Sequence, residues 1–260
     1  MSTPYVSQTQ YGKNEDFTVQ AARGQIQGHR VVTFSGYNAD IDTTWVPIWA
    51  DGSISFPTVA TVMKISSSSA ADVNTSGTGA WTVLLSGLNA EYNEISEVIA
   101  LNGQTAVNTV NLYLRINGFT VITAGTGLTA AGNIYAGNGV VTAGVPATVY
   151  DFIPVGWNAR QTAVYTIPAG YTAYVSYSRL TFAQVSGTNA VWGRVTITNS
   201  NNIKTATVSA VANNGIIEFQ PKYPIPVVEK TLIMAESMGA AVNNYASTVI
   251  QLILIKNPIA

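Results

Sequence analysis

The 260-residue sequence predicts an all-β protein, an antiparallel β-sandwich of jelly-roll-like form with an extended N-terminal arm. Short runs rich in Val, Ile, Thr and Tyr alternate apolar with polar residues, as strands buried on one face require. Polar clusters and four Asn-Gly pairs separate these runs, and Asn-Gly is a preferred pair for two-residue hairpin turns. No stretch has the spacing of a sustained helix, so many short antiparallel strands are expected.

Residues 1–30 are predicted to form the arm. They are rich in glutamine, only weakly periodic and free of hairpin signals. An ordered arm needs a neighbour to dock on, and the alternative is a frayed terminus. The candidate interface residues here are Gln8, Gln10, Gln25 and Gln27.

Residues 31–260 are predicted to form the sandwich domain. Residues 59–65 and 81–85 have strand character, and a Ser/Thr/Asn/Gly-rich loop at 66–79 lies between them. Turn residues of this kind supply the positive φ angles and side-chain hydrogen bonds that a tight connection needs. We therefore expect two strands joined by a long polar loop.

The clearest alternation in the chain covers residues 110–117. Val110, Leu112, Leu114 and Ile116 are predicted to face the core, and the residues between them the opposite side. Residues 95–101 and 119–122 flank this strand and are predicted to pair with it in a three-stranded meander. The meander is expected to turn at Asn102-Gly103 and at Asn117-Gly118.

Residues 123–147 are rich in Ala, Gly and Thr and contain Asn138-Gly139. This stretch is either a linker that divides the sandwich region into two domains or a long connection between two sheets. The pattern leaves both open.

Strands resume in the C-terminal half of the chain. Residues 203–211 are predicted to pair with 216–219 through Asn213-Asn214-Gly215. Residues 249–255 are apolar on both faces apart from Gln251, which predicts a central strand or one covered by a partner. The candidate interface residues of this strand are Val249, Leu252 and Leu254.

The amino-acid composition favours a protein that works as part of a larger assembly. Charged residues make up 10% of the chain, against roughly 25% in an average soluble domain, and the net charge is -1. Such a surface repels other protein molecules weakly. Without a basic run we expect no nucleic-acid binding. The absence of Cys, of a signal-peptide pattern and of an apolar run of about 20 residues predicts a soluble protein made in a cytoplasm, with no membrane partner.

Catalytic equipment is sparse. His29 is the single histidine, and no Gly-x-Ser-x-Gly elbow accompanies it, so we interpret it as a surface residue. An oxygen-only calcium site remains open, built from Asp40 and Asp42 or from the glutamates at 91, 94 and 97. Two carboxyl groups from Glu91, Glu94, Glu97 and Glu218 are the alternative candidates for a glycosidase pair. We expect a protein that is not an enzyme and has no cofactor.

Aromatic residues offer a second kind of site. Trp157, Trp192 and Tyr174 are the leading candidates for a platform on which sugar rings stack, as in carbohydrate-binding modules. The wider set of aromatic candidates also includes Trp45, Trp49, Trp81, Tyr165, Tyr171 and Tyr177. The alternative is that they belong to the core or to a protein interface, where Trp and Tyr are also enriched.

Two stretches, AWTVLLSGLNAEYNEI at 80–95 with LNG at 101–103, and YTIPAGYTAY at 165–174, resemble the β-rich virion structural proteins of tailed bacteriophages, notably of cyanobacterial and marine phages. The resemblance covers roughly residues 55 to 180. It implies a jelly-roll-like sandwich that works as a repeated part of the particle and supplies no active-site residues.

Together with the low charge, this resemblance leads us to expect a capsid decoration or cement protein located in the virion. Its expected partners are copies of itself, as a trimer, and the major capsid protein or other virion proteins. The alternatives are a tail, baseplate or receptor-binding fibre subunit, and a carbohydrate-binding β-sandwich module.

Overall fold

The computed structural model describes residues 15–51, 54–184 and 190–258, and apart from one short helix the regular elements of these residues are antiparallel strands. The predicted all-β sandwich class is therefore confirmed. The elements are α1 (Phe17–Ala22), β1 (His29–Ile41), β2 (Val46–Pro47), β3 (Thr61–Ser67), β4 (Ala80–Leu88), β5 (Glu94–Ala100), β6 (Val107–Tyr113), β7 (Arg115–Ala124), β8 (Ile134–Thr142), β9 (Val145–Ile153), β10 (Val164–Thr166), β11 (Tyr171–Gln184), β12 (Val191–Thr198), β13 (Lys204–Ala212), β14 (Gly215–Phe219), β15 (Ile225–Val227), β16 (Leu232–Gly239) and β17 (Asn244–Lys256).

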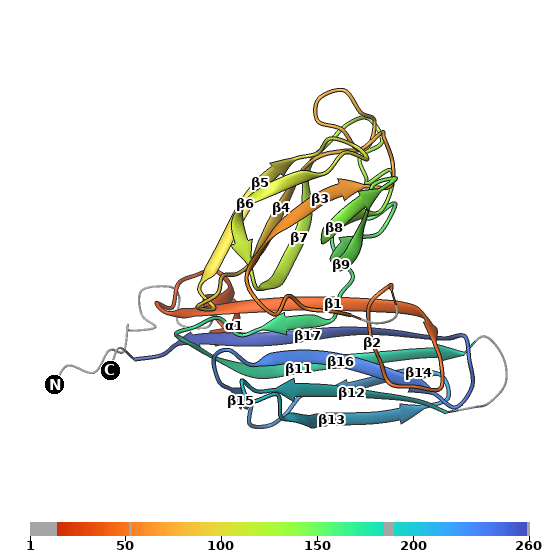
Figure 1. Cartoon of the computed structure of the whole chain (residues 1–260). Coiled ribbons are helices and arrows are strands. Elements are labelled where there is room, and N and C mark those ends of the chain that lie inside the picture. The colour runs from red at the N-terminus through yellow and green to blue at the C-terminus, as the bar shows by residue number, and fades with distance from the viewer. Residues whose placement is uncertain (1–14, 52–53, 185–189, 259–260) are drawn as a thin grey trace.

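The strands form two sandwiches, one inserted into the other (Figure 1). In the base sandwich, one sheet has the order β1-β17-β11-β14 with β15 also on β11, and the other has the order β10-β16-β12-β13 with β2 also on β16. The inserted sandwich pairs β6-β3-β8-β9 in one sheet and β5-β4-β7 in the other. The chain thus leaves the base after β2 and returns to it at β10.

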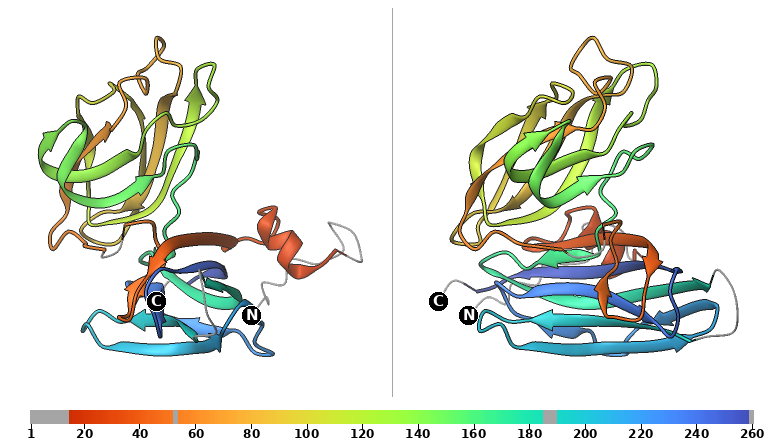
Figure 2. Two further views of the ribbon diagram at one scale, coloured as in Figure 1. Left: turned by 90° about the vertical axis from the view of Figure 1, so that its right-hand side faces the viewer. Right: turned by 45° about the vertical axis from the view of Figure 1, so that its right-hand side comes forward.

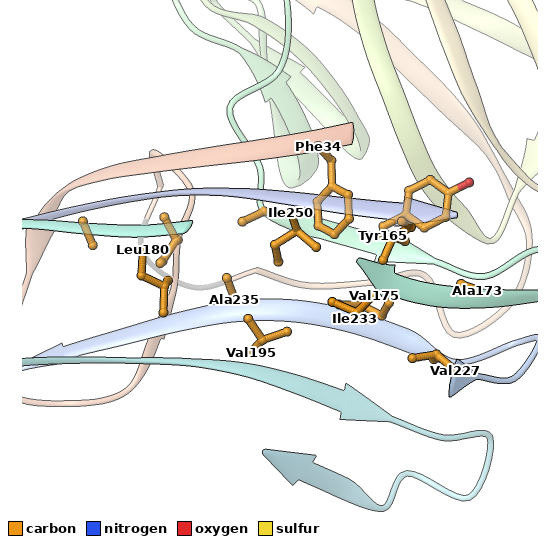
Figure 3. Close-up of a cluster of buried hydrophobic side chains, with 14 of the residues drawn as sticks. Phe34, Tyr165, Ala173, Val175, Leu180, Val195, Val227, Ile233, Ala235 and Ile250 are labelled. Carbon is orange, nitrogen blue, oxygen red and sulfur yellow. The ribbon is translucent and has the colours of Figure 1, made fainter. Parts of the chain in front are cut away.

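Each sandwich has its own hydrophobic core. Phe34, Leu180 and Ile250 belong to the core between the two base sheets (Figure 3). Met63, Leu85 and Phe119 belong to the core of the inserted sandwich. The inserted sandwich stands on the β1 side of the base, and the views of Figure 2 show the two as separate layered bodies. Since alternate strand residues point inward, both cores follow from the period of two in the sequence.

The stretch 123–147 lies wholly within the inserted sandwich, where it forms the end of β7, all of β8 and the start of β9. The chain passes between the sandwiches elsewhere, in the connections that precede β3 and that follow β9. Glycines in this stretch allow close packing: a β-carbon at Gly144 would lie 1.8 Å from the carbonyl oxygen of Ser67, and one at Gly125 would lie 2.2 Å from that of Gly77.

The Asn-Gly pairs do not form the predicted two-residue hairpins. Asn102-Gly103 links strands of different sheets, as does the Asn213–Gly215 segment, so the predicted pairing of 203–211 with 216–219 is wrong. Asn138-Gly139 accompanies a bulge in β8, and Asn117-Gly118 lies inside β7. Asn and Gly favour bulges and left-handed residues as well as hairpin turns, so the pair alone does not decide between them.

The predicted meander is also wrong. β5 pairs with β4, β6 with β3 and β7 with β4, so its three strands lie in two sheets. The strand predicted at 110–117 is interrupted at Leu114, between β6 and β7. The buried face of β6 is the opposite of the predicted one, because Tyr113 is buried and Val110 is 89% exposed. The register of β3 on β6 shifts between Val62 and Lys64. At this shift the polar Thr109 side chain turns inward, and its hydroxyl accepts a hydrogen bond from the Met63 amide.

The described part of the predicted arm contains a short helix, α1, which the sequence analysis did not anticipate. Asp16 caps it by accepting a hydrogen bond from the Thr18 amide. Gln25 is half-buried and Gln27 exposed, while Gln8 and Gln10 lie outside the described residues. Among the residues that the structure describes, no helix is long and apolar enough to span a bilayer.

Strand β17 is central in its sheet, between β1 and β11. Of the two interpretations of its apolar sequence, the structure shows the first. Leu252 and Leu254 are fully buried in the base core, and Val249 is half-buried on the opposite face of the sheet. The two leucines therefore contact strands of their own sandwich.

Candidate functional site

The junction between the sandwiches is centred on one buried ion pair. Arg160, in the connection from β9 to β10, is 2.5 Å from the Asp151 carboxylate, and both side chains are almost fully buried. The Arg160 guanidinium also donates to the carbonyl oxygens of Ile116, Thr162 and Val164. One side chain therefore connects β7 and β9 of the inserted sandwich to β10 of the base.

The Asp151 carboxylate has further partners. It accepts hydrogen bonds from the Thr162 hydroxyl at 2.7 Å and from the Phe152 amide at 2.9 Å. Burial raises the pKa of Asp151 above its ordinary value, and the Arg160 charge and these hydrogen bonds oppose that shift. The pair is thus well supplied with partners for its buried charges.

Further contacts fix the same junction. The Asn117 side chain donates to the Thr166 carbonyl at 2.8 Å and accepts from the Thr166 amide at 2.9 Å, so β7 is joined to β10 by a two-point contact. Arg30 of β1 forms an ion pair with Glu94 of β5. The Ala169 amide donates to the Tyr92 carbonyl. Contacts at several separated points restrict rotation of one sandwich on the other.

Beside these contacts lies a cleft of about 360 Å³ between the two sandwiches. Base residues Arg30, Val32 and Tyr165 line one wall. The other wall comes from β4, β5 and β7 of the inserted sandwich, and its residues are Ser86, Gly87, Glu94, Ile95, Ser96 and Asn117. Ser86 and Ser96 are directly paired in the antiparallel register, so their side chains lie on the same face of the sheet.

Tyr165 is the most enclosed polar side chain of this cleft, with 5% of its surface exposed. Its ring stacks on Phe34 at a centroid distance of 5.6 Å, and Figure 3 shows its hydroxyl directed away from the core cluster. No described residue forms a hydrogen bond with that hydroxyl. Burial raises the pKa of Tyr165 to about 12, a shift opposed by the Arg30 charge. The phenol is therefore a neutral donor at physiological pH.

The titration of Tyr165 gives a first prediction. Because its folded-state pKa lies above the unfolded value, the stability that it contributes is complete below pH 10 and is lost as pH rises to about 12. The shift corresponds to roughly 2–3 kcal/mol. The wild-type protein should lose more free energy of unfolding across this window than the Tyr165→Phe variant, as measured by urea unfolding at each pH. Equal losses in both proteins would contradict the assignment.

The predicted glycan platform is not assembled. Trp157 is 51% exposed in the connection after β9, Trp192 lies on β12 and Tyr174 on β11. Since Val191 and Val195 face the base core, as do Ala173 and Val175, Trp192 and Tyr174 alternate to opposite outer faces of the base. The structure does not bring these three aromatic residues together.

Two of the acidic candidates have structural partners. Glu97 accepts hydrogen bonds from the Val110 and Asn111 amides and so fastens β5 to β6, while Glu94 pairs with Arg30. His29 is within hydrogen-bond distance of the Gln27 carbonyl, and its ring contacts Phe17. The described residues contain no group of three or more His, Asp or Glu side chains placed to hold a metal ion.

Sequence reasoning did not single out Arg160, Asp151 or the cleft. Only one signal was available: Asp151 interrupts an otherwise apolar run, and a charge is rare in this chain, so a paired charge was a reasonable expectation. Tyr165 was one of several aromatic candidates for sugar stacking, and nothing in its strand-like run distinguishes it from the others. Its position at the junction depends on how the two sandwiches pack.

Comparisons with known proteins add little. No protein-family model matches the chain, and no curated protein matches it. Solved structures that are similar include a VP2 subviral particle of infectious bursal disease virus, at 9% identity over 89% of this chain and 73% of that chain, with a TM-score of 0.23. A structure of the Gt strain of that virus is 11% identical over 90% of this chain and 78% of that chain, with a TM-score of 0.21. Likeness at this level carries no functional argument.

Proposed function

We propose that this chain is a noncatalytic structural protein of a bacteriophage virion, and specifically a capsid decoration or cement protein that assembles with copies of itself. The observation that carries the proposal is the buried junction, which fixes a second sandwich firmly upon a base sandwich. A protein that reinforces a shell has to hold its contact surfaces in one relative position. The resemblance of residues 80–95 and 165–174 to phage virion proteins supports the same function.

The surface of the inserted sandwich supports contacts with other proteins. Val98 of β5 is 61% exposed, and Val110 and Leu112 of β6 are also largely exposed. These strands adjoin, because the Glu97 carboxylate of β5 binds the Val110 amide. Exposed apolar residues gathered in one place are typical of interaction surfaces. With a net charge of only -1, copies of the chain repel one another weakly.

Particle location tests the proposal. Antibody raised against the purified protein, applied to intact particles and viewed by electron microscopy, should label the head surface at many regularly spaced positions. Labelling confined to the tail would replace the decoration function by a tail, baseplate or fibre function. Absence of the protein from purified particles would overturn the virion proposal altogether.

Self-association is tested separately. Light scattering after gel filtration should give the mass of a trimer, and Val110→Asp with Leu112→Asp should shift the protein toward the monomer because charges disfavour an apolar contact. Thr120→Asp, on the exposed surface of β7, is the matched control and should leave the oligomer intact. A monomeric wild-type protein would contradict this part of the proposal.

A further inference from the structure

We propose that the cleft between the two sandwiches binds a neutral sugar residue, held between the Tyr165 hydroxyl and the paired Ser86 and Ser96 hydroxyls. This inference goes beyond the virion function and does not depend on it. It also differs from the aromatic platform considered above: Trp157, Trp192 and Tyr174 do not line this cleft, and Tyr165, which does, is proposed to act through its hydroxyl and not through its ring face.

Two polar groups of the cleft residues, on Tyr165 and Arg30, have no hydrogen-bond partner among the described residues. The Tyr165 side chain is more than nine-tenths buried, Tyr165 lines the cleft, and its hydroxyl has no hydrogen bond to any described residue. The Nε of Arg30 is buried and likewise has no partner. Buried polar groups in proteins are nearly always hydrogen-bonded, so the Arg30 Nε is open to an acceptor on a ligand. The Tyr165 hydroxyl is not among the fully buried atoms and is free to donate to a ligand or accept from one.

The charges and hydroxyl groups of the cleft lining favour a neutral ligand with several hydroxyl groups. The Arg30 and Glu94 charges neutralise each other across the cleft, so the lining offers no net charge to an ion. Hydroxyl groups both donate and accept, which suits a partner that carries several hydroxyls of its own. Val32 also lines the cleft and supplies apolar surface for the carbon–hydrogen face of a pyranose ring.

Size and location agree with this class. The volume of about 360 Å³ falls within the range of roughly 300–1,000 Å³ for small-molecule sites, at the lower end where a single sugar ring fits. Clefts between domains are a preferred position for such sites. A sugar bound here contacts β4 and β5 of the inserted sandwich together with β10 of the base, so it should strengthen the junction.

Binding is tested on the full-length protein with methyl glycosides of glucose, galactose, mannose and N-acetylglucosamine at millimolar concentrations. At least one should shift the amide NMR resonances of Ser86, Ser96 and Tyr165 in a saturable way. Glucuronate and glucosamine test the requirement for neutrality, and glycerol tests the requirement for a ring. If no glycoside shifts these resonances more than glycerol does, the proposal is overturned.

Three variants locate the site. Tyr165→Phe keeps the buried ring and removes only the hydroxyl, and it should weaken binding by about tenfold. Ser96→Val fills part of the cleft with a residue that strands favour, and it should abolish binding. Trp157→Ala is the control and should leave the affinity unchanged. Binding that survives the first two substitutions, or that is lost with Trp157→Ala, would place the sugar elsewhere and overturn the assignment.

Discussion

Replacing Arg160 with methionine should lower the free energy of unfolding by about 3–5 kcal/mol, the usual cost of removing one partner of a buried ion pair. The substitution leaves the Asp151 carboxylate buried without its cation, and it also removes donors from the Ile116, Thr162 and Val164 carbonyl oxygens. Urea unfolding followed by tryptophan fluorescence measures the loss.

A second substitution separates the cost of the unpaired Asp151 charge from the cost of the lost hydrogen bonds to the carbonyl oxygens. Combining Arg160→Met with Asp151→Asn should recover part of the stability, because the uncompensated negative charge is then absent. Arg179→Met removes an exposed arginine from β11 and is the matched control, with an expected change within about 0.5 kcal/mol. A loss below about 1 kcal/mol for Arg160→Met would show that this pair does not hold the junction.

Replacing Asp72 with alanine should destabilise the inserted sandwich by about 3 kcal/mol or more, since buried donors left unsatisfied cost about 1–3 kcal/mol each. The fully buried Asp72 carboxylate accepts hydrogen bonds from the amides of Ala80, Ala131 and Gly132 and from the Ser67 hydroxyl. It thereby ties the loop between β3 and β4 to the connection between β7 and β8.

Hydrogen exchange gives the sharper readout for Asp72. The amides of Ala80, Ala131 and Gly132 should exchange much faster in Asp72→Ala, while the base sandwich keeps its protection. Asp72→Asn retains one acceptor oxygen and should lose less stability. Asp42→Ala removes an exposed carboxylate and serves as the comparison. Unchanged protection at the three amides would contradict the proposed role of Asp72.

Both predictions concern carboxylates that are buried in the protein, although the chain has few charged residues. An isolated buried carboxylate is costly, so Asp72 and Asp151 persist only where donors surround them. Asp151 joins the sandwiches and Asp72 closes the loops of the inserted one. The proposed function requires these contacts to hold the two sandwiches in one arrangement.

Local strand character was predictable from the sequence, and the pairing of strands was not. Residues 59–65 and 81–85 correspond closely to β3 and β4. Alternation is a property of neighbouring residues and can be recognised in a single sequence. The meander prediction failed because the chain moves from β5 in one sheet to β6 in the other and returns to the first sheet at β7, and packing decides these changes of sheet.

Asn117 shows why an Asn-Gly pair was wrongly predicted to form a hairpin turn. An Asn-Gly pair is compatible with a hairpin, and nothing nearby in sequence indicates otherwise. In the folded chain Asn117 spends both polar atoms of its side chain on Thr166, 49 positions away. Gly118 faces Ser86 on the neighbouring strand, where a β-carbon would lie 3.4 Å from the serine β-carbon. The pair therefore serves the junction.

The sequence by itself determined that this protein is all-β, that its strands bury one face and that its surface carries little charge, because these properties depend on composition and on residues two positions apart. Only the tertiary structure decided that one sandwich is inserted into another and that Arg160, Asn117 and Tyr165 meet where they join. The physical reason is that these contacts bring together strands of both sandwiches: Asn117 binds Thr166, 49 positions away, and Arg160 binds the Ile116 carbonyl, 44 positions away. Their formation depends on two cores packing at once, and no local pattern encodes that.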